Sequence, residues 1–249
     1  MTHDEAFANW RQRRAAGESL TAIDLYELVA KPRGLQPEEL PLEERLELGR
    51  LAVPETWPGF VLLPEAERGR EPIEIVPYDN RWPSIFAQWK KRLLDVLPDR
   101  PRVEHVGSTS VPGLAAKPIV DIQVSVADLE DEAGYVPEIE SLGVRLRSRD
   151  ELHRYLVPLA GQPRAVHIHV CPAGSEWERS HLLFVTYLRR DASSRESYLA
   201  AKLAAAAKWR DDRWAYTDAK NEAIAAIMAR AEAWARDTGW SRQASSSSR

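Results

Sequence analysis

The sequence predicts an α+β protein in which a β-sheet core is flanked by helices. Short apolar strands alternate with helical segments between residues 73 and 171, and a helical run follows from 176 to 238. Helical segments also fill most of the first 52 residues. Strands that alternate with helices and then give way to helices alone are typical of a sheet with a helical cap. We therefore expect an N-terminal helical extension, a sheet-containing domain and a C-terminal helical cap.

The N-terminal part is predicted to contain three helices. They span residues 3–17, 21–31 and 37–52. Proline and glycine are then frequent from 53 to 72, which indicates a connection rather than a packed element. This change predicts three parts: 1–70 as the helical extension, 71–240 as the sheet-containing domain, and 241–249 as a disordered, serine-rich tail. The alternative is that residues 1–70 form a helical collar on a single domain.

The domain after residue 72 is predicted to hold five strands, at 73–76, 102–107, 119–126, 152–159 and 165–171. The clearest is IVDIQVSV at 119–126, where apolar and polar residues alternate. One helix begins at Trp82-Pro83, since proline is tolerated in a first helical turn, and it stops before Pro98. Further helices are expected at 128–142 and, in three pieces, across 176–238, where the second piece is the alanine-rich 194–209 and the last is 217–237.

Composition and charge exclude several classes of protein. The chain of 249 residues is 44% hydrophobic, which is enough for a core without disulfides, and its net charge of −4 lies in the first 70 residues. No basic footprint for duplex DNA is visible, and no apolar run approaches the roughly 18 residues that span a membrane. The start has no apolar signal segment, and a lone Cys171 excludes an internal disulfide and a cysteine-based zinc cluster. We expect a cytoplasmic protein with no membrane partner.

A hydroxyl-rich turn is expected directly after the strand at 102–107. Gly107 has no Cβ, so the backbone there can approach a ligand closely. Ser108, Thr109 and Ser110 follow, and free N–H groups at such a turn can bind phosphate oxygens. The alternative is an ordinary strand-to-helix turn in which these hydroxyls only cap the helix.

Two polar side chains lie on the strand that follows this turn. Asp121 and Gln123 are two residues apart and therefore project from one face, whereas Val120, Ile122 and Val124 project from the other. A carboxylate beside a phosphate-binding loop is suited to hold Mg²⁺ on a polyphosphate. The alternatives are a carboxylate bonded to loop backbone and a glutamine on a solvent-facing surface.

The stretch from 103 to 126 resembles the nucleotidyltransferase fold, whose pattern is an apolar residue, Gly-Ser, a spacer of about a dozen residues, and acid-apolar-acid on a strand. More narrowly, EHVGSTSVPGLAAKPIVDI is similar to the GrpB family, and the likeness continues through HIHV (167–170), HLLFVTYLR (181–189) and YTDAK (216–220). The resemblance implies a nucleotidyltransferase-like mixed β-sheet core flanked by helices, with a nucleoside triphosphate and metal site at the Gly-Ser loop.

Two positions depart from the family's pattern. The second acidic position is Gln123, and the run Phe184–Arg189 lacks an arginine and an aspartate that the family usually has. Because divalent ions at a phosphoryl-transfer site need compensating negative charge, the missing carboxylate lowers the expected rate of any catalysis.

Further candidate ligands lie outside this segment. Lys117, Arg189, Tyr216 and Lys220 are candidates for phosphate binding, although charged residues on helices commonly form only a solvated surface. His167 and His169 alternate on one strand and share a face. With His105 they could place imidazoles near Asp121, a set that suits Zn²⁺, Mn²⁺ or Fe²⁺, although histidines in sheets are more often simply hydrogen-bonded.

Three functions remain open at this stage. The first is a nucleotidyltransferase-like protein that binds a nucleoside triphosphate or another anionic small molecule with Mg²⁺, with Asp121 and Gln123 as catalytic residues, and transfers a nucleotidyl group to an unknown acceptor. The second is a degenerate member of the fold, a pseudoenzyme, that binds a ligand or a protein without turnover. The third is a histidine-dependent metal hydrolase. The sequence leaves the acceptor, the oligomeric state and the role of residues 1–70 open.

Overall fold

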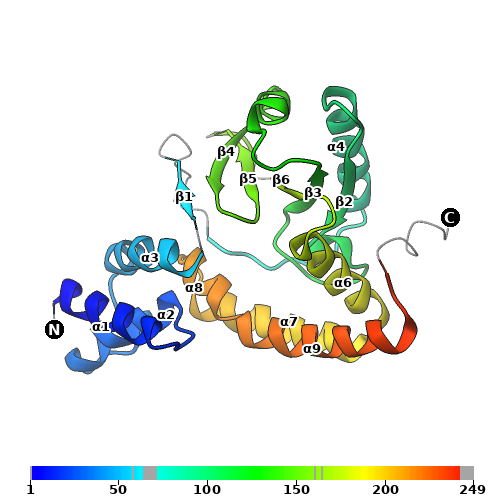
Figure 1. Cartoon of the computed structure of the whole chain (residues 1–249). Coiled ribbons are helices and arrows are strands. Elements are labelled where there is room, and N and C mark those ends of the chain that lie inside the picture. Colours follow the sequence, from blue (N-terminus) through cyan, green and yellow to red (C-terminus); the bar gives the residue numbers. More distant parts are fainter. Residues whose placement is uncertain (1, 58, 64–71, 160, 164, 242–249) are drawn as a thin grey trace.

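The computed structural model describes residues 2–57, 59–63, 72–159, 161–163 and 165–241. Its centre is a six-stranded sheet in the order β1-β4-β5-β6-β3-β2 (Figure 1). The strands are β1 (Val61–Leu62), β2 (Arg102–Val106), β3 (Val120–Val126), β4 (Val144–Arg149), β5 (Arg154–Pro158) and β6 (Val166–Pro172). Among the strands of the described residues, only β3 and β6 pair in parallel, and the other pairs are antiparallel. The predicted α+β class with a mixed sheet is therefore confirmed.

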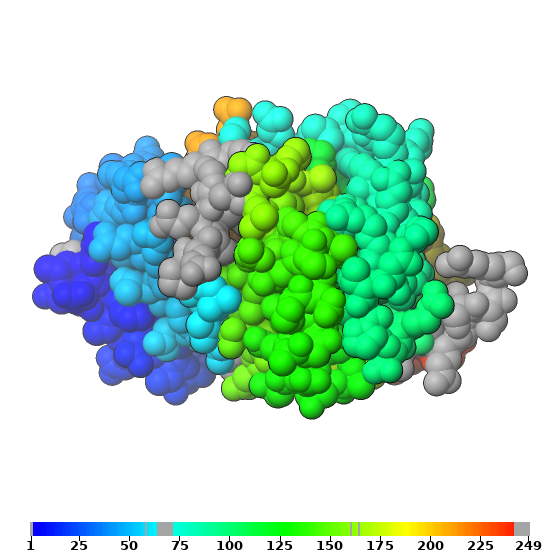
Figure 2. All heavy atoms as spheres, turned by 90° about the horizontal axis from the view of Figure 1, so that it is seen from above, coloured from blue at the N-terminus to red at the C-terminus, as the bar shows by residue number. Residues whose placement is uncertain are grey.

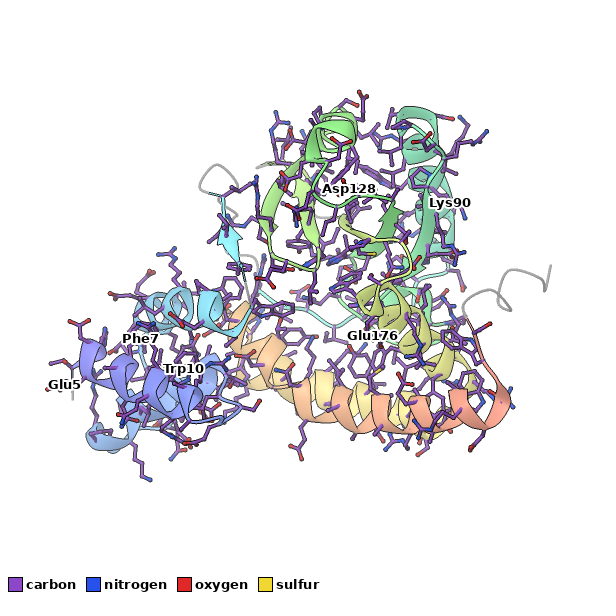
Figure 3. All side chains as sticks on the ribbon, in the orientation of Figure 1. Glu5, Phe7, Trp10, Lys90, Asp128 and Glu176 are labelled. Atoms are coloured by element: carbon purple, nitrogen blue, oxygen red, sulfur yellow. The ribbon has the colours of Figure 1, made fainter. Side chains whose placement is uncertain are left out.

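Helices cover both faces of this sheet. On one face, α4 (Trp82–Val96) and α5 (Val136–Glu140) pack over the core formed by the even-numbered residues of β3 and their neighbours on β6. On the other face lies α6 (Glu176–Arg190), whose first residue, Glu176, is labelled in Figure 3. Two long helices, α7 (Ala192–Lys208) and α9 (Asn221–Thr238), pack behind α6, and the short α8 (Arg213–Asp218) connects them (Figure 1).

The N-terminal helices form a separate hydrophobic cluster beside the sheet domain (Figure 2). They are α1 (His3–Ala15), α2 (Ala22–Ala30) and α3 (Leu42–Thr56), with 3-10 turns at Lys31–Arg33 and Pro37–Glu39. Trp10, labelled in Figure 3, is fully buried among them. The cluster also includes Trp209 and Tyr216, so the N-terminal helices pack directly against α8 and the end of α7.

Several predicted elements differ from the structure. Residues 73–76 form no strand and contribute a single bridge from Val76 to Ala116. The helix expected at 128–142 is reduced to a 3-10 turn (Glu132–Gly134) and the five-residue α5, since Pro137 can occupy only a first helical turn. β1 and β4 were not expected. The last helix is divided between α8 and α9, and α3 starts at Leu42 and continues past Pro54.

The serine-rich tail from residue 242 onward, and much of the expected connection, lie outside the described residues. Among the described helices, none is both long and apolar enough to cross a membrane.

Candidate functional site

The turn after β2 depends on Gly107. Its backbone has φ 67° and ψ −175°, a region that is essentially restricted to glycine. A Cβ at this position would lie 2.3 Å from Oδ2 of Asp121, so the absence of a side chain lets the carboxylate approach the turn. The N–H of Ser110 donates to the carbonyl of Gly107 at 3.2 Å and closes the 3-10 turn Ser108–Ser110.

This turn opens onto a cavity of about 140 Å³ between the sheet and the C-terminal helices. The predicted site residues that line the cavity come from four separate segments of the chain. They are Gly107, Ser108, Thr109, Lys117, Asp121, His167, Tyr216 and Lys220. The turn and the strand aspartate therefore share one cavity, as the sequence interpretation required.

Four further residues line the cavity, namely Ala116, Ile119, Tyr198 and Lys202, and none of them was named as a site residue from the sequence. Tyr198 and Lys202 lie four residues apart on α7 and point from its buried side into the cavity. The signal in the sequence was weak but present, because Ser194, Tyr198 and Lys202 recur at helical spacing in a segment otherwise rich in alanine. Burial raises the pKa of the Tyr198 hydroxyl to about 12 and Ser108 acts in the opposite direction, so this hydroxyl faces the turn.

Three lysines converge on the cavity. Lys202 is only 2% exposed and its ammonium donates to the carbonyl of Ala115. Burial, with Lys117 nearby, lowers the pKa of Lys202 to about 7. Burial, together with Lys117 and Lys202, also lowers the pKa of Lys220 to about 7. Crowded, desolvated ammonium groups are stabilised by a bound anion, so the cavity is electrostatically suited to one.

Tyr216 supports this lysine cluster from the side of the N-terminal helices. The ammonium of Lys220 lies 4.3 Å and that of Lys117 4.9 Å from its ring centroid. The ring is buried in the cluster that contains Trp209 and the N-terminal helices. Tyr216 thus acts as an aromatic wall for two cations rather than as a hydrogen-bond donor at the surface.

Three predicted phosphate ligands have other roles in the structure. The hydroxyl of Ser110 donates to the carbonyl of Gly107 at 2.8 Å, and Ser110 does not line the cavity. The hydroxyl of Thr109 donates to the carbonyl of Ile119 at 3.2 Å, although the residue does line the cavity. Arg189 lies outside the cavity and donates to the carbonyl of Ser110 at 3.0 Å, so it fixes the backbone of the turn.

Asp121 lies beside two histidines on the neighbouring strand. Its Oδ1 is 3.3 Å from Nδ1 of His167 and 3.7 Å from Nε2 of His169. Burial acts to raise the pKa of the Asp121 carboxyl, but the two histidines outweigh it and hold this pKa below its usual value. A carboxylate and two imidazoles gathered at one point form a candidate metal-binding cluster.

Two predicted residues do not join this cluster. Gln123 is fully buried on the face that α6 covers and does not line the cavity, because it lies two residues further into the sheet than Asp121. His105 pairs with Ile122 and therefore lies on the opposite face, where its ring stacks on Phe86 of α4. His105 therefore lies away from Asp121, whereas Gln123 shares the face of Asp121 and is the register partner of His169.

The donor set fits Mg²⁺ poorly. Mg²⁺ prefers oxygen ligands in an octahedral arrangement, and here Asp121 offers the one carboxylate while its neighbours are imidazoles.

A second cavity of about 530 Å³ adjoins the first and shares Lys117 and Ile119 in its wall. The rest of its lining is mostly apolar, with one acidic and one basic residue. Those residues are Pro72, Ile73, Glu74, Pro118, Pro163, Ala165 and Arg213. A ligand held by its charged end at the lysines could thus place a larger, less polar part here.

Known proteins are similar to this chain in sequence and in fold. Residues 72–230 match the family described as GrpB protein. The chain is 44% identical over 167 residues to a UPF0157 protein of Streptomyces coelicolor, covering 66% of this chain and 88% of that protein. It is 40% identical over 166 residues to a UPF0157 protein of Halalkalibacterium halodurans, covering 65% and 83%.

A solved structure agrees with these matches. The crystal structure of conserved protein GrpB from Enterococcus faecalis has a TM-score of 0.57 and 29% sequence identity to this chain, and the match covers 65% of this chain and 99% of that one. The resemblance stated from the motifs is confirmed, and the chain belongs to the GrpB family.

Proposed function

We propose that this GrpB-family protein binds a nucleoside triphosphate, or another phosphate ester, in the cavity next to Gly107, and that its chemistry is of the nucleotidyltransferase kind. The observation that carries the proposal is the convergence of Lys117, Lys202 and Lys220 with Ser108 on a cavity that has a single carboxylate. Protonated lysines form charge-assisted hydrogen bonds to phosphate oxygens. These bonds offset the free-energy cost of removing the anion from water.

The dimensions of the two cavities support a phosphate at the lysines and the remainder of the ligand beyond them. A volume of about 140 Å³ is well below the roughly 300–1,000 Å³ of typical sites for drug-sized ligands. It suits a phosphate group but not a whole nucleotide. The adjoining cavity of about 530 Å³, with Ile73, Pro118 and Ala165 in its wall, has the size and apolar character for a sugar and base.

In this arrangement each chain residue has a distinct task. Lys202, anchored by Ala115, and Lys220, held against Tyr216, would neutralise phosphate oxygens. Ser108 and the N–H groups of the turn would orient them. If a nucleotidyl group is transferred, the lysines would stabilise the negative charge that develops on the phosphate being attacked, which is the main requirement of phosphoryl chemistry.

Calorimetry tests the proposal directly. ATP, GTP, CTP, UTP and inorganic triphosphate are titrated into the full chain, with and without divalent metal. We expect binding of at least one of them, and at least a tenfold weaker affinity for Lys220→Met. Lys208→Met serves as the control, because Lys208 is an exposed lysine of the same helical cap that is paired with Glu38. No binding of any of these compounds at millimolar concentration would remove the proposal.

The position of Gln123 favours a second candidate function: phosphate-ligand binding without nucleotidyl transfer. Its amide is buried, lies outside the cavity, and has no hydrogen-bond partner among the described residues, so a second acidic ligand is missing at the place where the fold usually has one. Incubation with α-labelled nucleotides and cell extract separates the two candidates. Stable binding without any labelled product supports the binding protein, and labelled product that depends on Lys202 supports the transferase.

A further inference from the structure

We propose that Asp121, His167 and His169 form a binding site for a divalent cation of the first transition series that accepts imidazole nitrogen, such as Zn²⁺ or Co²⁺, and not for Mg²⁺. This inference goes beyond the proposed function, because phosphate binding by the lysines requires no such ion. It rests on the distances, the supporting strands and the packing of the rings.

The distances between the donor atoms are compatible with a shared metal ion. In a tetrahedral site with bonds of about 2.0–2.1 Å, two ligand atoms lie about 3.3–3.4 Å apart. The separations from Oδ1 of Asp121 are 3.3 Å to His167 and 3.7 Å to His169, and all three ligand atoms lie within 4.8 Å of one another. A separation of 3.7 Å is too long for a normal hydrogen bond, so Nε2 of His169 faces the carboxylate without bonding to it.

The three ligands are held by the most regular part of the sheet. β3 and β6 lie side by side (Figure 1) and pair in parallel. Asp121 is opposite His167, and His169 lies two residues further along the same face of β6. Because both strands are central in the sheet, the positions of the three side chains are fixed by backbone pairing rather than by a loop. Rigid supporting elements are what a metal site requires.

Packing also fixes the orientation of the rings. The ring of His169 lies 4.9 Å from that of Tyr155 and 5.8 Å from those of His153 and Trp177. The hydroxyl of Tyr155 lies 3.0 Å from Nδ1 of His167 and holds that ring in place.

Three protein donors leave the metal with open positions, since these ions take four to six ligands. Asp121 and His167 both line the lysine cavity, whereas His169 lies behind them. The open positions therefore face the cavity, where water or a phosphate oxygen can complete the coordination.

The test uses the full chain without a histidine tag, because a tag would itself bind these metals. The protein is stripped with EDTA, and Co²⁺, Zn²⁺, Mn²⁺ and Mg²⁺ are titrated in phosphate-free buffer by calorimetry, with the visible absorption of bound Co²⁺ as a second readout. We expect one equivalent of Co²⁺ and Zn²⁺ to bind at least about 100-fold more tightly than Mg²⁺. We expect His167→Gln and His169→Gln each to weaken Co²⁺ binding at least tenfold and to shift its absorption bands.

The control is His3→Gln, which removes an imidazole that binds Glu44 in the N-terminal helices. It should bind Co²⁺ as the wild type does. Thermal unfolding in EDTA checks that each variant is folded, and if a histidine variant is not, the ratio of Co²⁺ to Mg²⁺ affinity in the wild type decides alone.

Equal affinity for Mg²⁺ and Co²⁺, no uptake of Co²⁺ at 1 mM, or wild-type affinity in both folded histidine variants would overturn the proposal. Metal binding together with no binding of any phosphate compound, with or without divalent metal, leaves this inference standing and removes the proposed function. Phosphate binding without metal binding removes this inference and leaves the proposed function standing.

Discussion

Lys202 offers a prediction in which stability and ligand binding change in opposite directions. The side chain is 2% exposed and its pKa is lowered from 10.5 to about 7, mainly by burial. At 1.36 kcal/mol per pKa unit, the buried ammonium destabilises the folded state by about 5 kcal/mol below pH 7. Lys202→Met removes that cost but leaves the carbonyl of Ala115 without its donor, a loss of about 1–3 kcal/mol.

We therefore expect the free Lys202→Met protein to be more stable than the wild type by about 2 kcal/mol at pH 6–7. For a chain of this size that is a rise in Tm of at least about 4 °C. Between pH 7 and 10.5 the unfolded wild type holds a proton on Lys202 that the folded state lacks, so wild-type stability rises with pH. The advantage of the variant should shrink over that interval.

The same substitution should weaken phosphate binding. A charged hydrogen bond contributes about 1.5–3 kcal/mol, which corresponds to a loss of about 10- to 100-fold in affinity. Urea unfolding at pH 6, 8 and 10 and calorimetry with triphosphate measure the two effects, and Lys208→Met is the control. A less stable variant that still binds phosphate as tightly as the wild type would refute this reasoning.

Three further predictions follow from the site. Gly107→Ala should lower stability by about 2–4 kcal/mol, because the backbone conformation of Gly107 excludes a side chain and the new Cβ would clash with Asp121. The control Gly113→Ala, at φ 79° with no atom within 4 Å of the new Cβ, should cost about 1 kcal/mol. Equal changes in Tm for the two variants would contradict this prediction. Asp121→Asn should abolish the effect of transition metals on nucleotide affinity without weakening phosphate binding in EDTA, and calorimetry under both conditions would detect a different outcome. Phosphate binding at pH 8 should be accompanied by proton uptake, because a bound anion raises the lowered pKa values of Lys202 and Lys220. Calorimetry in buffers of different ionisation enthalpy measures this proton uptake. A binding enthalpy that does not depend on the buffer would argue against lysine involvement.

The sheet could be predicted where its signal is local. β3 and β6 have alternating or β-branched sequences, and both were located within one residue of their ends. β1 has only two residues, and β4 (VRLRSR) reads as a charged segment whose pairing depends on β5, so neither could be identified without the partner strand. The segment 73–76 has strand-like residues, but its only bridge is to Ala116, because tertiary contacts and not propensity decide strand formation.

The site could be predicted in part, where its residues lie close together in the sequence. Gly107 and Ser108 directly follow β2, and Asp121 lies on the adjacent β3, so short-range geometry brings them to one cavity. Lys202 comes from a distant helix, and only the packing of α7 behind α6 brings it there. His105 was misplaced because neighbouring residues of a strand point to opposite faces, and the pairing register that decides the face follows from the fold as a whole.

A crystal structure with a non-hydrolysable nucleoside triphosphate tests the central claim most directly. We predict phosphate oxygens within hydrogen-bonding distance of Ser108, Lys202 and Lys220, and the sugar and base in the adjoining cavity beside Pro118. A nucleotide bound at another surface, with Lys202 still bonded only to Ala115, would contradict the account.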